Sequence, residues 1–286
     1  MDNYVIPSLI EKFVGFLEQH GKSQFTIVAY KKDLEQFTGY LTSHEKNDIR
    51  DVTKENISGF ISHMIQNNYA KKSASRKLNS IRTFFRYLKN EGVINQNPAF
   101  EISHPKCVQV PPRILTKIEY RALRDFSKED SRTYAVIEIL LQTGLRIGEL
   151  ANLMLEDIKK DSLVVRPYGK GKERIVPANR IVQAAISNYL KARGESSSLY
   201  LFITRTGNPL LIRNIRQIIG RCFREVGIEN ATVNDLRNTF IAHQLAGGVS
   251  VEYIAKVVGH RRLSSTEKFL SLSKEKLEKK ERLGEL

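Results

Sequence analysis

Two stretches in the second half of the chain decide its fold: Thr143-Gly144-Leu145-Arg146-Ile147-Gly148-Glu149-Leu150 and Val258-Gly259-His260-Arg261-Arg262-Leu263-Ser264-Ser265-Thr266-Glu267-Lys268-Phe269. In the first, Gly144 allows a sharp turn, and the helix that follows fixes the direction of Arg146. In the second, His260 follows a glycine at the end of a helical pattern. Two more blocks lie between them: Gly169-Lys170-Gly171-Lys172-Glu173-Arg174 and Val233-Asn234-Asp235-Leu236-Arg237-Asn238-Thr239-Phe240.

Length and composition predict an ordinary soluble protein. The 286 residues are enough for two modest domains, and 41% of them are hydrophobic. No apolar run approaches the length of a membrane span, and the N-terminus lacks the pattern of a signal peptide, so we expect a cytoplasmic protein without membrane contact. Cys107 and Cys222 stand far apart. They indicate neither a disulfide framework nor a metal site, and no motif predicts a cofactor.

The charge favours a polyanionic partner. The chain carries 46 basic and 31 acidic residues, a net charge of +15. Residues 1–105 contribute +3 and residues 106–286 contribute +12, so the excess is built into folded elements and is not a basic tail. The net charge alone does not tell whether the partner is DNA, RNA or an anionic membrane.

Hydrophobic periodicity divides the chain into two parts. Apolar residues recur at helical spacing over residues 8–44, and two further helical patterns follow before residue 90. Glycine and proline then break the pattern, and the prolines around residue 110 predict an extended segment. We therefore predict a helical domain over residues 1–103, a linker over residues 104–113 and a second domain over residues 114–286.

The second domain is predicted to be mostly helical with a small sheet. Two short β-like runs, Ser162–Arg166 and Arg174–Pro177, flank the glycine-rich turn at residues 168–172. Helical patterns precede and follow them. The fold class is therefore mainly α, with a small antiparallel sheet that we expect to contain three strands.

One helix of the first domain is strongly basic. Residues 70–90 contain no Asp or Glu, and their apolar side chains fall on one helical face. Five cations fall on a separate arc of about 140°: Lys72, Arg76, Arg82, Arg86 and Lys89. A solvated face usually mixes charges of both signs. Contact with phosphates is therefore favoured over a merely solvated face.

The four blocks, in this order, resemble the motifs of the tyrosine recombinase family, which includes phage integrases and Xer-like site-specific recombinases. The resemblance covers essentially the whole chain. It implies a SAM-like helical core-binding domain and an α+β catalytic domain with a three-stranded antiparallel sheet. It also implies a double-stranded DNA recombination site as substrate, no cofactor, and a homo-oligomer: a dimer on each site and a tetramer in the synapse.

The resemblance also implies roles for single residues. Arg146 matches the first catalytic arginine. Lys170 matches the lysine that protonates the departing 5′-hydroxyl, and Lys172 and Arg174 are then DNA-backbone contacts. Arginine suits this metal-free chemistry because its fork binds two phosphate oxygens and stays charged. Without the other three blocks, the turn that contains Lys170 would be interpreted as a merely solvated β-hairpin.

The third block departs from the family pattern. Arg237 matches the second catalytic arginine, but Asn234 and Asn238 stand where histidine is common. Asparagine can donate a hydrogen bond to a phosphate and cannot transfer protons near neutral pH. His260 matches the family's glycine–histidine block, where it would hydrogen-bond the phosphate or relay a proton.

Phe269 is the decisive departure, because the family has its nucleophilic tyrosine at this position. Phenylalanine has no hydroxyl, and no tyrosine follows Tyr253 in the chain. One hypothesis is a site-specific recombinase whose nucleophile has been replaced with little change of shape. The alternative is a natural pseudo-recombinase that binds a DNA site as an architectural or regulatory protein. General RNA binding has no supporting motif.

Overall fold

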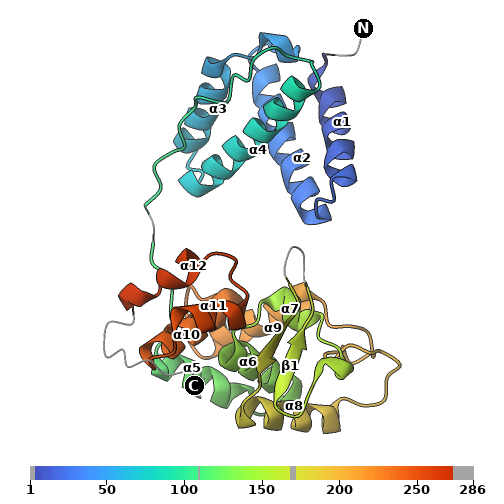
Figure 1. The fold of residues 1–286 in the computed structure, drawn as a ribbon, viewed down its shortest axis with the longest axis vertical. Coiled ribbons are helices and arrows are strands. Elements are labelled where there is room, and N and C mark those ends of the chain that lie inside the picture. The colour runs from blue at the N-terminus through green and yellow to red at the C-terminus, as the bar shows by residue number, and fades with distance from the viewer. Residues whose placement is uncertain (1–3, 109, 168–171, 273–286) are drawn as a thin grey trace. The chain divides into compact units, whose positions relative to one another are not determined.

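The structure is a computed structural model that describes residues 4–108, 110–167 and 172–272 (Figure 1). The chain divides into two compact units, Met1–Gln109 and Val110–Leu286, and the division falls within the predicted linker. Each unit has its own hydrophobic core. The two units therefore have the character of separate domains.

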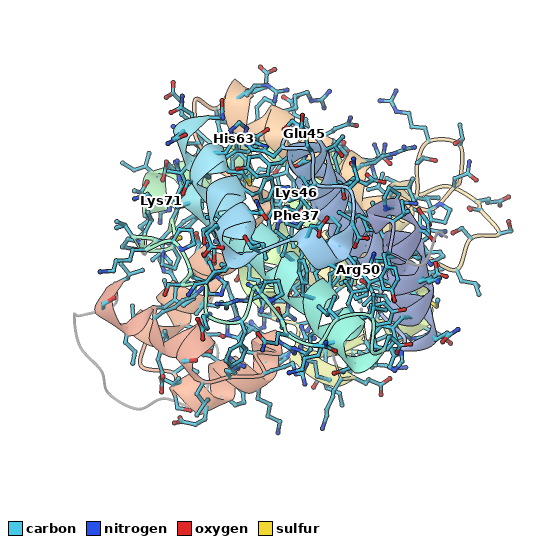
Figure 2. All side chains as sticks on the ribbon, turned by 90° about the horizontal axis from the view of Figure 1, so that it is seen from above. Phe37, Glu45, Lys46, Arg50, His63 and Lys71 are labelled. Carbon is cyan, nitrogen blue, oxygen red and sulfur yellow. The ribbon has the colours of Figure 1, made fainter. Side chains whose placement is uncertain are left out.

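The N-terminal unit is a helical bundle. Its described residues form α1 Ile6–Gln19, α2 Gln24–Thr42, η1 Ile49–Asp51, α3 Lys54–Gln66 and α4 Lys71–Asn90. Ser23 caps α2, since its hydroxyl accepts a hydrogen bond from the backbone N–H of Thr26 at 3.2 Å. The core is mainly aliphatic and contains five aromatic rings: Phe13, Phe37, Phe60, Phe84 and Phe85. Figure 2 labels Phe37, which is 1% exposed, together with the exposed side chains of Glu45 and Arg50.

A buried carboxylate joins α2 to α4. Asp33 is 1% exposed and accepts hydrogen bonds from Nη1 and Nη2 of Arg76 at 2.5 and 2.8 Å. It also accepts from Lys77 Nζ at 2.8 Å and from Ser80 Oγ at 2.7 Å. Lys77 is itself buried, and a buried charge is costly without its counter-ion. These groups therefore fix how α2 packs against α4.

The C-terminal unit is mainly helical. Its described helices are α5 Lys117–Ser127, α6 Ser131–Thr143, α7 Ile147–Ala151, η2 Leu155–Asp157, α8 Arg180–Ala192, α9 Ile212–Glu225, α10 Val233–Ala246, α11 Val251–Val258, α12 Ser264–Glu267 and η3 Leu270–Leu272. Helix α6 is buried on nearly all sides and packs against α8 and α10, so it forms the centre of the core. In the part of the chain that the structure describes, no helix is long and apolar enough for a membrane span.

The described part of this unit has a sheet of two strands, so the expected third strand is not confirmed. Strand β1 Ser162–Val165 pairs antiparallel with β2 Arg174–Pro177. Another extended segment pairs elsewhere: Leu199 and Leu201 share backbone hydrogen bonds of 2.9 and 2.7 Å with residues 153–155. This contact stays an isolated bridge because the chain turns into η2 at once.

We expect Asp33→Ala to destabilise the N-terminal unit by about 3–5 kcal/mol, because it leaves the charge of Lys77 buried without a partner. Urea denaturation of the full chain measures the loss, and hydrogen exchange in α2 and α4 assigns it to this unit. The matched control is Glu11→Ala, which removes an exposed partner of Lys31 and should change the midpoint little. Equal effects of the two substitutions would contradict the structural role of Asp33.

Candidate functional site

The site is built around the C-terminal end of α11. Gly259 adopts a left-handed conformation with φ of 68°, and the backbone N–H of His260 turns back to Ala255 O at 2.8 Å. This turn ends the helix and leaves the last carbonyls without helical partners. The carbonyls of Val257, Val258 and Gly259 therefore present the negative end of the helix to other groups.

Three arginines from different elements bind these carbonyls. Arg174 of β2 donates from Nε to Val257 O at 2.7 Å. Arg237 of α10 donates from Nη2 to Val258 O at 2.8 Å, and from Nη1 to Gly144 O at 2.5 Å. Arg146, which precedes α7, donates from Nη2 to Gly259 O at 2.9 Å. The end of one helix thus gathers three guanidinium groups at one place.

One buried carboxylate partly balances these charges. Glu149 is 5% exposed and accepts from both Nη atoms of Arg174 at 2.9 and 2.8 Å. It also accepts from Arg146, through Nη1 at 2.9 Å and through the backbone N–H at 2.8 Å. Burial opposes its ionisation, but the hydrogen bonds from the two arginines outweigh burial and lower the pKa of Glu149. One anion among three cations leaves an excess of positive charge.

Two glycines are required by this packing. Gly144 has φ of 63°, and a Cβ atom there would lie 2.5 Å from Cδ1 of Phe240. Gly259 is also left-handed, and a Cβ atom there would lie 3.0 Å from Cζ of Arg174. At Gly144 both the backbone conformation and the lack of space exclude a side chain, and at Gly259 the left-handed conformation disfavours one. These glycines let the turns approach closely enough for the arginines to reach the carbonyls.

Arg237 is held in an electrostatically unfavourable position. It is 5% exposed, and burial followed by the neighbouring charge of Arg146 lowers the pKa of Arg237 to about 9. The guanidinium still carries its charge at neutral pH. A buried cation beside other cations is stabilised by an anion that can reach it. This arrangement suits the binding of a phosphate group.

His260 lines a hollow beside the arginines. Its Nδ1 lies 2.8 Å from the hydroxyl oxygen of Thr266. Burial, followed by the charges of Arg237 and Arg146, lowers the pKa of His260 to about 3, so the ring is neutral at pH 7. The hollow has a volume of about 480 Å³, and its lining residues are Arg146, His260, Arg261, Arg262 and Ser265.

Phe269 lies between α12 and η3. Its side chain is 1% exposed and belongs to the core of the unit. The ring centroid lies 5.1 Å from Nζ of Lys268, and the backbone N–H donates to Thr266 O at 3.0 Å. Thr266 therefore contacts both residues: its hydroxyl lies at the ring of His260, and its backbone carbonyl accepts from Phe269.

The other predicted site residues lie in different surroundings. Asn234 is exposed on the first turn of α10, whereas Asn238 is buried and donates to Asp235 Oδ1 at 3.0 Å. Lys172 is exposed. Lys170 lies outside the described residues. The structure brings Arg146, Arg237 and His260 together around the end of α11.

Arg174 has other partners than the sequence suggests. Its side chain is 11% exposed and is bound to Glu149 and to the end of α11. These contacts hold the guanidinium inside the unit, where Glu149 also binds Arg146. The DNA-backbone contact expected of Arg174 stays a prediction, and the described side chain lies in a supporting position inside the site.

The five cations predicted to form a basic stripe on α4 (Lys72, Arg76, Arg82, Arg86 and Lys89) differ in their surroundings. Lys72, Arg86 and Lys89 are exposed. Arg76 is bound to Asp33, and its side chain stays 52% exposed. Arg82 turns back onto its own unit: Nε donates to Ala99 O at 3.1 Å, and the guanidinium also binds Ile102 O and His104 Nε2. Only part of the stripe is therefore available to a partner.

Sequence reasoning missed Thr266 and the inward role of Arg174. The spacing of Glu149 three residues after Arg146 marks a capping box and points to their contact. No comparable signal marks Thr266, because a threonine between serine and glutamate has no special pattern. Within the described residues, no group of His, Cys, Asp and Glu is arranged to hold a metal ion.

Comparison with known proteins gives matches over most of the chain. The model of the phage integrase family matches residues 113–276, and that of the phage integrase N-terminal SAM-like domain matches residues 10–92. Tyrosine recombinase XerC of Leptospira interrogans is 32% identical over 279 residues, which cover 93% of this chain and 89% of the relative. Tyrosine recombinase XerD of Listeria monocytogenes is 30% identical over 283 residues, covering 94% and 95%.

Solved structures with a similar fold include two of lambda integrase. A dimer bound to a COC′ core site has a TM-score of 0.78 and 18% identity, and covers 91% of this chain and 97% of that chain. A tetramer bound to a Holliday junction has a TM-score of 0.77 and 19% identity, with coverage of 92% and 79%. At such low identity the likeness concerns the fold alone.

We expect His260 to make stability pH-dependent. Its pKa is about 3 in the folded chain and 6.5 as the ordinary value, so the unfolded chain binds the proton first. The stabilisation from the neutral ring is present above pH 6.5 and is lost as the pH falls towards 3. His260→Asn should therefore flatten the plot of unfolding free energy against pH, measured by urea denaturation.

The comparison is made above pH 4.5, because Glu149, with its lowered pKa, adds its own loss of stability below that value. The control is His44→Asn, which changes an exposed histidine of the other unit. His44→Asn should keep the slope of the unsubstituted protein. The same slope in the protein and in His260→Asn would show that His260 is not buried in its neutral form.

Proposed function

This chain belongs to the phage integrase family of tyrosine recombinases, and we propose that it binds a duplex recombination site through a phosphate-binding centre formed by Arg146, Arg237 and His260. The observation that carries the proposal is the excess positive charge at the end of α11. Three guanidinium groups face one carboxylate there, beside a hollow of about 480 Å³ with a cationic lining. An arrangement of this kind is completed by an anion.

In the proposed reaction, a tyrosine at position 269 would lose its hydroxyl proton to water and attack the phosphorus atom of one strand through its oxygen. A bond from phosphorus to the tyrosine oxygen forms, and the bond to the 5′-oxygen breaks. Arg146 and Arg237 stabilise the charge on the non-bridging oxygens, and His260 hydrogen-bonds one of them. Lys170 is proposed to protonate the departing 5′-oxygen, with Lys172 and Asn234 contacting the DNA beside it.

Phe269 prevents the first step, since a phenyl ring offers no oxygen to the phosphorus atom. We therefore propose that this chain binds the site and leaves it uncut. Assembly would follow the pattern of its DNA-bound structural relatives, with a dimer on one site and a tetramer at a junction. The described residues Arg146, Arg237 and His260 favour a recombinase that has lost its nucleophile.

A second function is a natural architectural or regulatory DNA-binding protein. Two departures favour it: Phe269 lacks the nucleophile, and Asn234 lacks a proton-transferring ring. Both functions predict specific binding of duplex DNA. They differ in whether cleavage returns when the missing hydroxyl is restored.

We expect the protein to form no covalent adduct with a nicked suicide substrate in a denaturing gel, and Phe269→Tyr to form one. The reason is that the supporting groups are present and only one oxygen is missing. The control is Phe269→Tyr combined with Arg146→Ala, which should lose the band because the charge on the phosphate is no longer stabilised.

A covalent band from the unsubstituted protein would show that another hydroxyl serves as nucleophile and would contradict the role given to position 269. Absence of a band from Phe269→Tyr, with specific binding retained, would favour the architectural or regulatory function.

We expect the exposed cations of α4 to contribute to a strong salt dependence of binding. Neutralising Lys72, Arg86 and Lys89 together should reduce the slope of log affinity against log salt by about 0.9 for each lost phosphate contact. Titration of a labelled duplex at several salt concentrations measures the slope.

The control neutralises three other cations of this unit that do not belong to α4, Lys12, Lys46 and Lys54. It should change the slope less than the α4 variant. Equal slopes for the two variants would mean that the stripe is a solvated face.

A further inference from the structure

Thr266 binds the ring of His260 from the side away from solvent. The threonine is fully buried, and its hydroxyl oxygen lies 2.8 Å from Nδ1. His260 lines the hollow beside Arg146, whereas Thr266 does not. With Nδ1 bound to the buried hydroxyl, Nε2 is the ring nitrogen left for a ligand in the hollow.

A neutral imidazole carries one proton, and its position decides what the ring can bind. With the proton on Nε2, the ring donates a hydrogen bond to an anionic oxygen in the hollow. With the proton on Nδ1, Nε2 offers only a lone pair, which repels such an oxygen. The hydroxyl of Thr266 selects between these forms, because it can either donate to Nδ1 or accept from it.

The backbone around Thr266 favours donation. The carbonyl of Leu263 already accepts the backbone N–H groups of Thr266 and Glu267, at 2.7 and 2.9 Å. The carbonyl of Arg262 accepts from the backbone N–H of Ser265 at 3.1 Å. Both lone pairs of the Leu263 carbonyl are therefore used, and the acceptor that lies at the hydroxyl, 2.8 Å away, is Nδ1 of His260.

We propose that Thr266 is a positioning residue that donates its hydroxyl hydrogen to Nδ1 of His260 and so keeps the ring proton on Nε2, where it can bind a phosphate oxygen. The inference rests on the proposed function for its ligand class, a phosphodiester of DNA. The same threonine accepts the backbone N–H of Phe269 at 3.0 Å. It thus holds the histidine and the nucleophile position in one fixed relation.

The first test reads the ring directly and needs no DNA. Two-bond ¹⁵N–¹H correlation spectra of the full chain, at pH 7 and with ¹⁵N-labelled histidine, separate the two neutral forms. We expect the proton on Nε2 in the unsubstituted protein and in Thr266→Ser, which keeps the hydroxyl. Thr266→Val has nearly the same shape without the hydroxyl, and should shift the ring towards a mixture of both forms.

A ring proton on Nδ1 in the unsubstituted protein would overturn the inference, whatever the variants do. So would an unchanged spectrum in Thr266→Val. Because the first of these outcomes needs no substitution, the inference stays testable even if Thr266→Val folds poorly.

The second test measures cleavage of a suicide substrate in the Phe269→Tyr background. Thr266→Val should slow the single-turnover cleavage rate about tenfold or more, the size expected for one hydrogen bond to a charged group, with a smaller effect on DNA affinity. Thr266→Ser should recover most of that rate. Combining Thr266→Val with His260→Ala should add little to the effect of His260→Ala alone, because both act through one hydrogen bond.

The two tests separate the inference from the proposed function. If the ring proton lies on Nε2 and depends on Thr266, but Phe269→Tyr never cleaves, the positioning role stands and the recombinase reaction fails. If Phe269→Tyr cleaves and Thr266→Val cleaves equally fast, the reaction stands and the positioning role is overturned.

Discussion

The binding of three guanidinium groups by the end of α11 is the interaction on which the rest of the site depends. Helix termini leave carbonyls unpaired, and here arginine side chains take the place that water would have. Each arginine comes from a different element: Arg146 from the turn before α7, Arg174 from β2 and Arg237 from α10. Glu149 neutralises part of the charge, and an excess of positive charge remains at the end of α11.

The same interaction explains why the small sheet belongs to the site. Arg174 is the first residue of β2, and its hydrogen bonds to Glu149 and to Val257 O connect the strand to α7 and α11. The glycine-rich turn that carries Lys170 precedes this arginine by a few residues. Arg174 therefore fixes the start of β2 relative to α7 and α11.

The basic helix α4 could be predicted from sequence because hydrophobic periodicity determines it. The four motif blocks could be found because their residues lie close together in the chain. The partners of single arginines could not. A helical wheel gives the direction of Arg76 and Arg82, but each side chain is long enough to turn back to a partner on another segment. Asp33 lies 43 residues before Arg76, and Val257 lies 83 residues after Arg174. Contacts at such separation are set by tertiary packing. The same holds for the backbone pairing of Leu199 and Leu201 with residues 153–155, which lies outside the sheet of two described strands.

Phe269 shows that folding and chemistry constrain this site separately. The ring is 1% exposed in the core, and replacing a tyrosine by phenylalanine keeps its apolar surface and its shape. The contacts that organise the site use backbone carbonyls, Glu149 and the hydroxyl of Thr266, and none of them needs an oxygen on residue 269. Under the proposed function, a chain could therefore lose the nucleophile and keep the phosphate-binding centre, and binding of DNA would be separable from its cleavage.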